Sequence, residues 1–160
     1  MKIGIMGGTF NPIHNAHLLI AEMAREEYGL DRVIFITDGN PPHKSANVTA
    51  KQRFEMTHIA IADNSAFEED DFEINRSEKS YTVNTLGYLK EKYPNNDLFF
   101  IIGEDSLNDF DKWYKPDKIL EMCSLLVFPR KSLKSLTETI KAVKEKMKGR
   151  IFPVSAPVFR

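Results

Sequence analysis

The chain has 160 residues, of which 42% are hydrophobic and 28% are charged, and its formal net charge is −1. This length is typical of one domain with its own core, and the near-neutral charge gives no overall field that attracts nucleic acid or anionic lipid. The single cysteine, Cys123, excludes an internal disulfide framework and lies among apolar residues, so we expect it in the core rather than at a catalytic centre. No apolar run is long enough to span a membrane, and the first residues have a strand pattern rather than that of a signal peptide. We therefore expect a cytoplasmic protein without nucleic-acid or membrane partners.

Five short apolar segments have the composition of buried strands. Most are continuously apolar, as expected for strands that are covered on both faces of a parallel sheet. They are Ile3–Met6, Val33–Ile36, Leu98–Ile102, Leu125–Phe128 and Ile151–Val154. A sixth, shorter strand is expected near Phe72–Asn75, and the acidic run Phe67–Glu73 is interpreted as a solvated turn.

Helical segments separate these strands. The first, Ala16–Tyr28, ends at Gly29, and the second begins at Thr49, which can form a capping box with Gln52. Further helices are expected over Thr82–Lys92, Asp117–Met122 and Leu136–Met147. In the basic stretch 130–150, Leu133, Leu136, Ile140, Val143 and Met147 recur at helical spacing. This pattern favours an amphipathic helix with a wet basic face rather than an RNA-binding segment.

The alternation of strands and helices predicts an α/β fold, with a doubly wound, mostly parallel, Rossmann-like sheet and helices on both faces. In such sheets, ligands bind at the edge where the carboxyl ends of the strands and their loops meet. Three polar segments follow predicted strands at this edge: Gly7–His17, Thr37–Lys44 and Gly103–Trp113. No linker or low-complexity segment divides the chain, so we expect a single domain.

The loop after the first strand, GGTFNPIHNAH, combines two glycines with two histidines. Gly7 and Gly8 allow the backbone to approach a ligand, and the following helix offers unpaired N–H groups, which together predict a phosphate site. His14 and His17 lie on neighbouring positions of one helix face and can donate to phosphate oxygens. Two alternatives are a tight turn with solvated histidines and a zinc site, although no further ligand lies at a suggestive spacing.

This loop resembles the G-x-F-x-P-x-H-x-G-H signature of the nucleotidyltransferase superfamily, whose members join a nucleoside monophosphate to a phosphorylated acceptor. The matching residues are Gly8, Phe10, Pro12, His14 and His17. Ala16 stands where the signature has a glycine, which adds a methyl group but removes no catalytic group.

Four further segments, in the same order, resemble those of bacterial nicotinate-nucleotide adenylyltransferases. The segments are NPPHK (40–44), INRSEKSYTVNTL (74–86), FFIIGEDSLNDFDKWYK (99–115) and LLVFPR (125–130). The resemblance covers nearly the whole chain. It implies a transferase of NAD biosynthesis that converts ATP and nicotinate mononucleotide into deamido-NAD and pyrophosphate.

The resemblance implies that His14 and His17 are catalytic and donate to oxygens of the α- and β-phosphates. Binding of ATP is assigned to Gly8, Thr9, Phe10, Lys44, Gly103 and Asp105. Asp105 suits the ribose hydroxyls, with a helix cap as the alternative. Mg²⁺ is expected to arrive with ATP, and no metal site of the protein itself is expected. The acceptor phosphate is already ionised near neutral pH, so catalysis needs neither a general base nor a covalent intermediate.

Binding of nicotinate mononucleotide is assigned to Asn40, His43, Thr82, Thr85, Trp113 and Tyr114. Trp113 offers an electron-rich face to the cationic ring, and its alternative is a large core residue. Thr82 and Thr85 offer hydroxyl and helix N-terminal N–H groups to the ring carboxylate, and their alternative is an ordinary N-cap. The family uses backbone N–H groups near Thr82 and Tyr114 for this carboxylate, which implies a preference for nicotinate over nicotinamide.

The family also has an I-S-S-T-x-I-R motif that helps to bind the ATP phosphates, and this sequence ends at PVSAPVFR, about where that motif begins. We therefore expect a single nucleotidyltransferase domain, residues 1–160, that lacks this segment, folds, binds nicotinate mononucleotide and binds ATP weakly. Two other interpretations are a nucleotidyltransferase with a different acceptor, which Trp113 and SYTVNT disfavour, and a nucleotide-binding fragment with little activity. The sequence does not define the oligomeric state and is compatible with a homo-oligomer.

Overall fold

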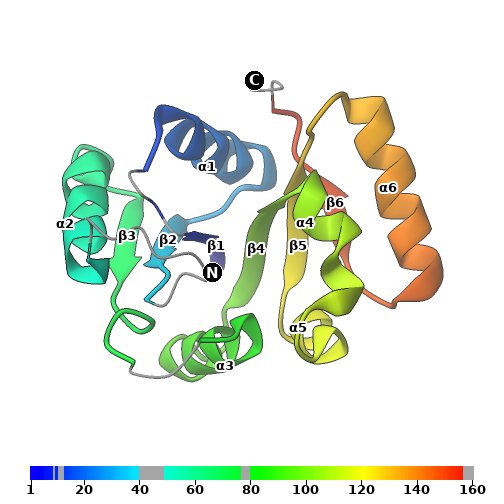
Figure 1. Ribbon diagram of the computed structural model, residues 1–160. Helices are drawn as coiled ribbons and strands as arrows, with labels where there is room; N and C mark the ends of the chain where they lie inside the picture. Colours follow the sequence, from blue (N-terminus) through cyan, green and yellow to red (C-terminus); the bar gives the residue numbers. More distant parts are fainter. Residues whose placement is uncertain (9, 11–12, 40–48, 77–79, 157–160) are drawn as a thin grey trace.

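The computed structural model describes residues 1–8, 10, 13–39, 49–76 and 80–156. Their strands form one six-stranded sheet in the order β3-β2-β1-β4-β5-β6, and all neighbouring strands are parallel (Figure 1). The strands are β1 (Lys2–Gly8), β2 (Arg32–Thr37), β3 (Phe67–Asp70), β4 (Asp97–Gly103), β5 (Ser124–Phe128) and β6 (Ile151–Pro153). The predicted doubly wound α/β fold is confirmed, and the sheet is parallel throughout the described residues.

Helices cover both faces of this sheet (Figure 1). They are α1 (Asn15–Tyr28), α2 (Ala50–Ile61), α3 (Thr82–Lys92), α4 (Glu104–Asn108), α5 (Pro116–Met122) and α6 (Leu133–Lys146), with a 3₁₀ turn at Phe110–Lys112. The helices α1 and α2 pack on the cluster around Phe35, whereas α3 to α6 pack on the cluster around Leu125. All five predicted helices are confirmed, while the short α4 and the 3₁₀ turn lack the length that gives a periodic pattern.

Local signals in the sequence define where two of the helices begin and end. Thr49 Oγ1 accepts from the backbone N–H of Gln52 at 3.1 Å, and the Gln52 side chain accepts from the backbone N–H of Thr49 at 2.9 Å. This is the predicted capping box. At the end of α1, Gly29 has a φ of 63°, in the left-handed region that glycine adopts without strain.

The prediction of a short strand near Phe72–Asn75 was wrong. Residues 72–75 form turns, and β3 lies within the acidic run that was interpreted as solvated. Asp70 is only 4% exposed, because its carboxylate accepts hydrogen bonds from the Tyr88 hydroxyl and from the Lys92 ammonium, both at 2.9 Å. A buried acid is tolerated when it is paired in this way, and a sequence pattern contains no sign of partners on a distant helix.

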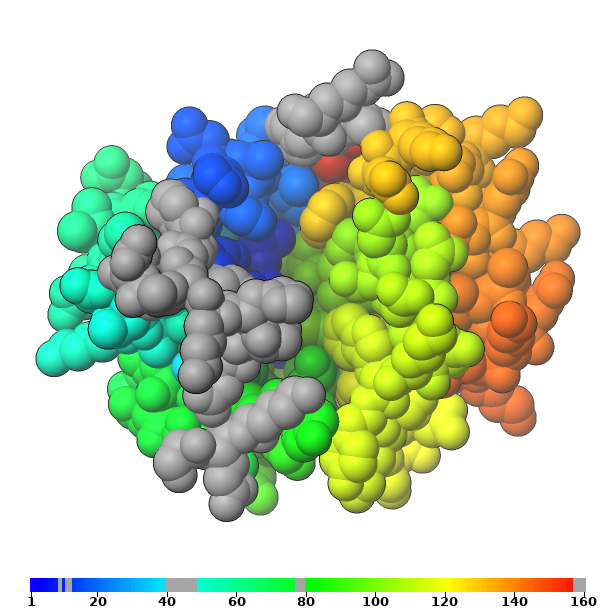
Figure 2. Space-filling model, viewed as in Figure 1, coloured from blue at the N-terminus to red at the C-terminus, as the bar shows by residue number. Residues whose placement is uncertain are grey.

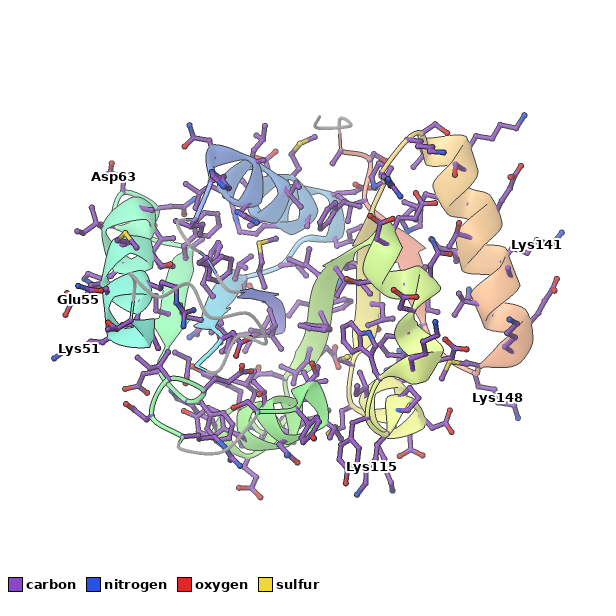
Figure 3. The ribbon with its side chains drawn as sticks, in the orientation of Figure 1. Lys51, Glu55, Asp63, Lys115, Lys141 and Lys148 are labelled. Atoms are coloured by element: carbon purple, nitrogen blue, oxygen red, sulfur yellow. The ribbon has the colours of Figure 1, made fainter. Side chains whose placement is uncertain are left out.

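The expected core positions are largely confirmed. Cys123 is 1% exposed, and burial raises the pKa of its thiol to about 12, as expected of an inert core residue. Along α6, Leu136 and Ile140 are buried, and Lys141 points away from the sheet, so the amphipathic interpretation holds (Figure 3). Leu133 departs from it, since it begins the helix and is 46% exposed. In the part of the chain that the structure describes, no helix has the length and apolar character needed to cross a membrane.

The strand register brings the carboxyl ends of four neighbouring strands to one edge. Gly8 at the end of β1 lies beside Thr37 at the end of β2, and Gly103 at the end of β4 lies beside Phe128 at the end of β5. The three loop segments that the sequence analysis singled out all start at this edge. The fold therefore brings the candidate ligand residues together, as the strand order requires.

We expect loss of the Lys92 ammonium to destabilise the protein, because it would leave the buried Asp70 carboxylate without its cation. The Asp70 side chain is 2% exposed and that of Lys92 is 45% exposed, so Lys92→Met should lower the free energy of unfolding by about 2 kcal/mol, less than for a fully buried pair. Urea denaturation measures the difference. Lys90→Met, which removes an exposed lysine from the same helix, is the control, and equal effects of the two substitutions would contradict the expectation.

Candidate functional site

Two neighbouring cavities open at the carboxyl edge of the sheet. The Trp113 cavity, of about 250 Å³, lies over the ends of β1 and β2 and against α3. The His17 cavity, of about 380 Å³, lies between α1 and the loops after β4 and β5. The strands that lead to the two cavities, β1 and β4, are neighbours in the sheet.

The turn after β1 is built around a contact that only glycine allows. A Cβ on Gly8 would lie 2.9 Å from the ring of Phe10, closer than real Cβ contacts. Phe10 has a φ of 49° and is 3% exposed, and its ring meets the His17 ring edge-on at 5.5 Å between centroids. The Phe10 side chain therefore supports His17, and only the Phe10 backbone is free to face a phosphate.

The two histidines occupy the first turn of α1, as their spacing predicts. The backbone N–H of His14, the N-cap residue, donates to Nδ1 of His17 at 3.0 Å, and the two rings stack at 5.8 Å. A nitrogen that accepts a hydrogen bond carries no proton, so this contact assigns the proton of neutral His17 to Nε2. Burial, and to a smaller extent His14, lowers the pKa of His17. His17 therefore presents a neutral N–H donor rather than a cation.

A metal site finds no support in the described part of the chain. Among those residues no three His, Cys, Asp or Glu side chains come together in a way that could hold an ion. His17 also uses Nδ1 for the contact with His14, which leaves Nε2 as its one outward-facing ring nitrogen. The absence of a metal site of the protein itself stays a prediction.

Among the described residues that line the His17 cavity, Arg130 is the one cation. Its guanidinium forms an ion pair with Asp105 at 3.1 Å, and both side chains are 65% exposed. Asp105, expected to bind ribose or to cap a helix, lies in the first turn of α4 and lines the cavity, whereas the N-cap position is taken by Gly103. No role was predicted for Arg130, although this residue ends the LLVFPR segment.

A buried carboxylate holds this rim in place. Glu104 is 6% exposed and accepts from the backbone N–H of Arg130 at 3.1 Å, from Ser135 Oγ at 3.2 Å and from Thr139 Oγ1 at 2.9 Å. These bonds join α4 to α6, and Figure 2 shows the segment from α4 to α5 beside α6 on one face. Because Glu104 and Asp105 are adjacent, the network fixes the cavity rim relative to the sheet.

Trp113 is both a core residue and a cavity residue. Its indole packs against Phe110 and Phe100, with 4.9 and 6.1 Å between the ring centroids. It nevertheless stays half-buried and lines the Trp113 cavity. It also lines a third cavity of about 260 Å³, the Tyr114 cavity, beside the start of α3. Packing therefore fixes one part of the ring, and another part faces open space; that this part binds the cationic ring stays a prediction.

The start of α3 differs from the expected N-cap. Thr82 is the first helical residue, and the N-cap residue is Tyr81, which makes no capping hydrogen bond with its side chain. Thr85 is 4% exposed, and its hydroxyl donates to Glu73 Oε2 at 2.6 Å, so its proton is already used. Tyr114 is 48% exposed, with its ring 4.6 Å from that of Tyr81.

Glu73 and Ser80 are cavity residues that the sequence analysis did not identify. Glu73 follows β3 and lines the Trp113 cavity, and burial raises the pKa of its carboxyl group. The Ser80 hydroxyl is buried with no hydrogen-bond partner among the described residues, and Ser80 lines both the Trp113 and Tyr114 cavities. The SYTVNT segment, which begins with Ser80, could have identified the serine. No sequence signal distinguishes the half-buried Glu73 from the other acids of its run.

Four assigned residues lie outside the described residues: Thr9, Asn40, His43 and Lys44. Most of the other assigned residues line the two main cavities or the Tyr114 cavity, whereas His14 and Phe10 line none of the three and contact the ring of His17 instead. Their roles in binding or catalysis stay predictions.

Comparison with protein families and curated sequences gives consistent matches. The model of the cytidylyltransferase-like family matches residues 5–156. A relative from Citrifermentans bemidjiense, named a probable nicotinate-nucleotide adenylyltransferase, is 47% identical over 144 residues, which cover 88% of this chain and 67% of the relative. One of the same name from Pelobacter propionicus is 51% identical over 132 residues, 81% of this chain and 61% of the relative. The chain thus spans about two thirds or less of the length of these relatives.

Solved structures share the fold. The Plasmodium falciparum nicotinic acid mononucleotide adenylyltransferase complexed with NaAD superposes with a TM-score of 0.78 at 22% identity, covering 99% of this chain and 77% of that chain. The same enzyme complexed with APC gives a TM-score of 0.76 at 20% identity. At these identities, the likeness establishes the Rossmann-like architecture and no more.

We expect His17 to be the Nε2–H tautomer and to titrate below its usual pKa of about 6.5. The unfolded chain takes up this proton near pH 6.5 while the folded protein resists it. The stability due to neutral His17 is therefore present above that pH and is lost as the pH falls below it. Nitrogen-15 NMR of the imidazoles measures both properties. An Nδ1–H tautomer, or a midpoint at or above 6.5, would contradict this description of the site.

Proposed function

The chain belongs to the cytidylyltransferase-like family and, within it, to the nicotinate-nucleotide adenylyltransferases, and on this premise we propose that it transfers the adenylyl group of ATP to nicotinate mononucleotide. The products are deamido-NAD and pyrophosphate, and the reaction is a step of NAD biosynthesis. One observation carries the proposal: a cavity with a neutral histidine N–H donor and a cavity with an aromatic wall both lie at the carboxyl edge of one sheet. The first suits a polyphosphate and the second suits a pyridine ring.

The proposed reaction is an in-line displacement at phosphorus. An oxygen of the acceptor phosphate forms a bond to the α-phosphorus of ATP, while the bond between that phosphorus and the oxygen bridging to the β-phosphate breaks. Pyrophosphate leaves with the electron pair of the broken bond. The attacking oxygen carries no proton near neutral pH, so the protein needs to position the two substrates and to stabilise the charge that moves between them.

On the ATP side, we assign this stabilisation to the first turn of α1. The Nε2–H of His17 would donate to a phosphate oxygen, with His14 beside it, and the free N–H groups of the turn add to the positive potential. We further assign Arg130 to the negative charge of the donor and Asp105 to its ribose. Mg²⁺, brought by ATP as part of the substrate, would neutralise the leaving pyrophosphate.

On the acceptor side, we assign the ring to Trp113 and its carboxylate to the Tyr114 cavity. There the first N–H groups of α3, the unpartnered Ser80 hydroxyl and the ammonium of Lys112 offer donors to an anion. A carboxylate gains more from these donors than a neutral amide does, which supports nicotinate over nicotinamide. Asn40, His43 and Lys44 keep their predicted roles.

The decisive experiment measures pyrophosphate release from ATP with three acceptors. We expect turnover with nicotinate mononucleotide, little turnover with nicotinamide mononucleotide and none with phosphopantetheine. Equal rates with the first two acceptors would contradict the assigned carboxylate site. Turnover with phosphopantetheine alone would contradict the proposed acceptor.

Replacing His17 should slow the chemical step much more than it weakens binding. Loss of a preorganised donor costs about 2.7–4 kcal/mol in the transition state, so His17→Ala should lower kcat roughly a hundredfold or more while KM changes little. Steady-state kinetics measure both quantities. His58→Ala, which removes a 74% exposed histidine from α2, is the matched control. Activity of His17→Ala within a few-fold of the parent would refute the assignment.

Binding of nicotinate mononucleotide should quench the fluorescence of Trp113. The chain has one tryptophan, so its emission reports this contact alone. An electron-poor ring stacked on the indole quenches the emission because it accepts an electron from the excited indole. Ribose 5-phosphate, which lacks the ring, should leave the emission unchanged. Binding detected by calorimetry with no change in emission would show that the ring lies elsewhere.

A further inference from the structure

The Trp113 cavity has an acidic wall that the proposed reaction does not explain. Of the described residues that line this cavity, Asp38 and Glu73 alone are charged, and both are acids. We propose that Glu73 determines specificity by selecting an acceptor whose ring nitrogen carries a permanent positive charge. The inference rests on the proposed function, since it concerns the same acceptor. It adds Glu73 as a binding residue and the charge of the ring nitrogen as the property that is recognised.

Glu73 is held in one position. Its Oε2 accepts from the Thr85 hydroxyl at 2.6 Å, and Thr85 itself is 4% exposed and part of α3. The backbone below Glu73 is equally constrained, because a Cβ on Gly39 would lie 2.1 Å from the Glu73 carbonyl oxygen. The loop after β2, which carries Asp38, therefore packs directly on the turn that carries Glu73. The two acids share one rigid wall.

The carboxylate of Glu73 has a charge that its surroundings compensate poorly. Burial raises the pKa of Glu73 most, the hydrogen bond from Thr85 lowers it, and smaller effects of Asp38 and Arg76 raise and lower it respectively. Among the described residues, no lysine, arginine or histidine forms an ion pair with Glu73. A partly buried anion without a close cation is costly, and a bound cation would offset that cost.

The polarity of the neighbouring cavities fits such a ligand. Trp113 lines both the Trp113 cavity and the Tyr114 cavity, so an aromatic ring against it has the acids on one side and the start of α3 with Lys112 on the other. A nicotinate ring bound to ribose is positive at its nitrogen and negative at its carboxylate. It therefore matches both sides, whereas a ring without charge leaves Glu73 uncompensated.

Calorimetry with two ligands tests the inference without ATP. The first ligand is nicotinate mononucleotide, and the second is its carbon-linked analogue, the 5-phosphate of a 3-carboxyphenyl riboside, which keeps the shape and the carboxylate but has a neutral ring. Glu73→Gln keeps the length of the side chain and an acceptor for Thr85 and removes only the charge. The parent should prefer the cationic ring about tenfold, and Glu73→Gln should lose most of that preference by weakening the cationic ligand alone.

Two variants serve as controls. Glu91→Gln removes the same charge from an exposed position on α3 and should keep the full preference. Glu73→Asp keeps the charge and should keep a preference for the cationic ring. If Glu73→Gln fails to fold, the comparison of the two ligands on the parent and on Glu73→Asp decides the matter.

Three results would overturn the inference. Equal affinity of the folded parent for the two ligands would remove its basis while leaving the proposed function intact. Equal weakening of both ligands by Glu73→Gln would assign Glu73 a structural role through Thr85. Binding of neither ligand to the folded parent would overturn the proposed function and, with it, this inference.

Discussion

The whole site depends on how tightly the backbone turns as it leaves β1. Gly8 comes so close to Phe10 that no Cβ fits between them, and Phe10 in turn supports the ring of His17. The turn also aims the backbone N–H of His14 at Nδ1 of His17. The position and the tautomer of His17 thus follow from one constraint on the main chain, while burial and, to a smaller extent, His14 lower its pKa.

Two buried acids, Asp70 and Glu104, and the half-buried Glu73 hold other elements in place. Asp70 joins β3 to α3, Glu104 joins α4 to α6, and Glu73 joins the turn after β3 to α3. Each carboxylate offers several acceptor sites, so one side chain can receive donors from different elements. Such networks stabilise only when they are complete, since a lost donor leaves a charge without compensation in a poorly solvated place.

Sequence patterns predicted the parts of the fold that depend on local or periodic signals. Interactions within a few residues determine the apolar runs of β1, β2, β4 and β5, the capping box at Thr49 and the left-handed conformation of Gly29. The strand β3 was missed because its last acid, Asp70, is buried by partners that lie 18 and 22 positions away in the chain. The same reason applies to the site: the loop of His14 and His17 is a local motif, whereas Glu73 and Arg130 acquire meaning only from the neighbours that folding gives them.

The division of charge between the cavities bears on how two anionic substrates meet. Under the proposed function, a triphosphate and an acceptor phosphate must approach each other, which costs free energy unless the protein supplies positive potential at the meeting point. The first turn of α1 and Arg130 supply it on the side of the His17 cavity, and neutral His17 adds a donor that needs no counter-ion. Asp38 and Glu73 make the wall of the Trp113 cavity acidic, and Glu73, which has no ion-pair partner among the described residues, disfavours a phosphate placed beside it. When Trp113 holds the ring of the acceptor, the favourable direction for the acceptor phosphate is toward α1. Attraction by α1 and repulsion by the acidic wall thus orient the same reacting phosphate.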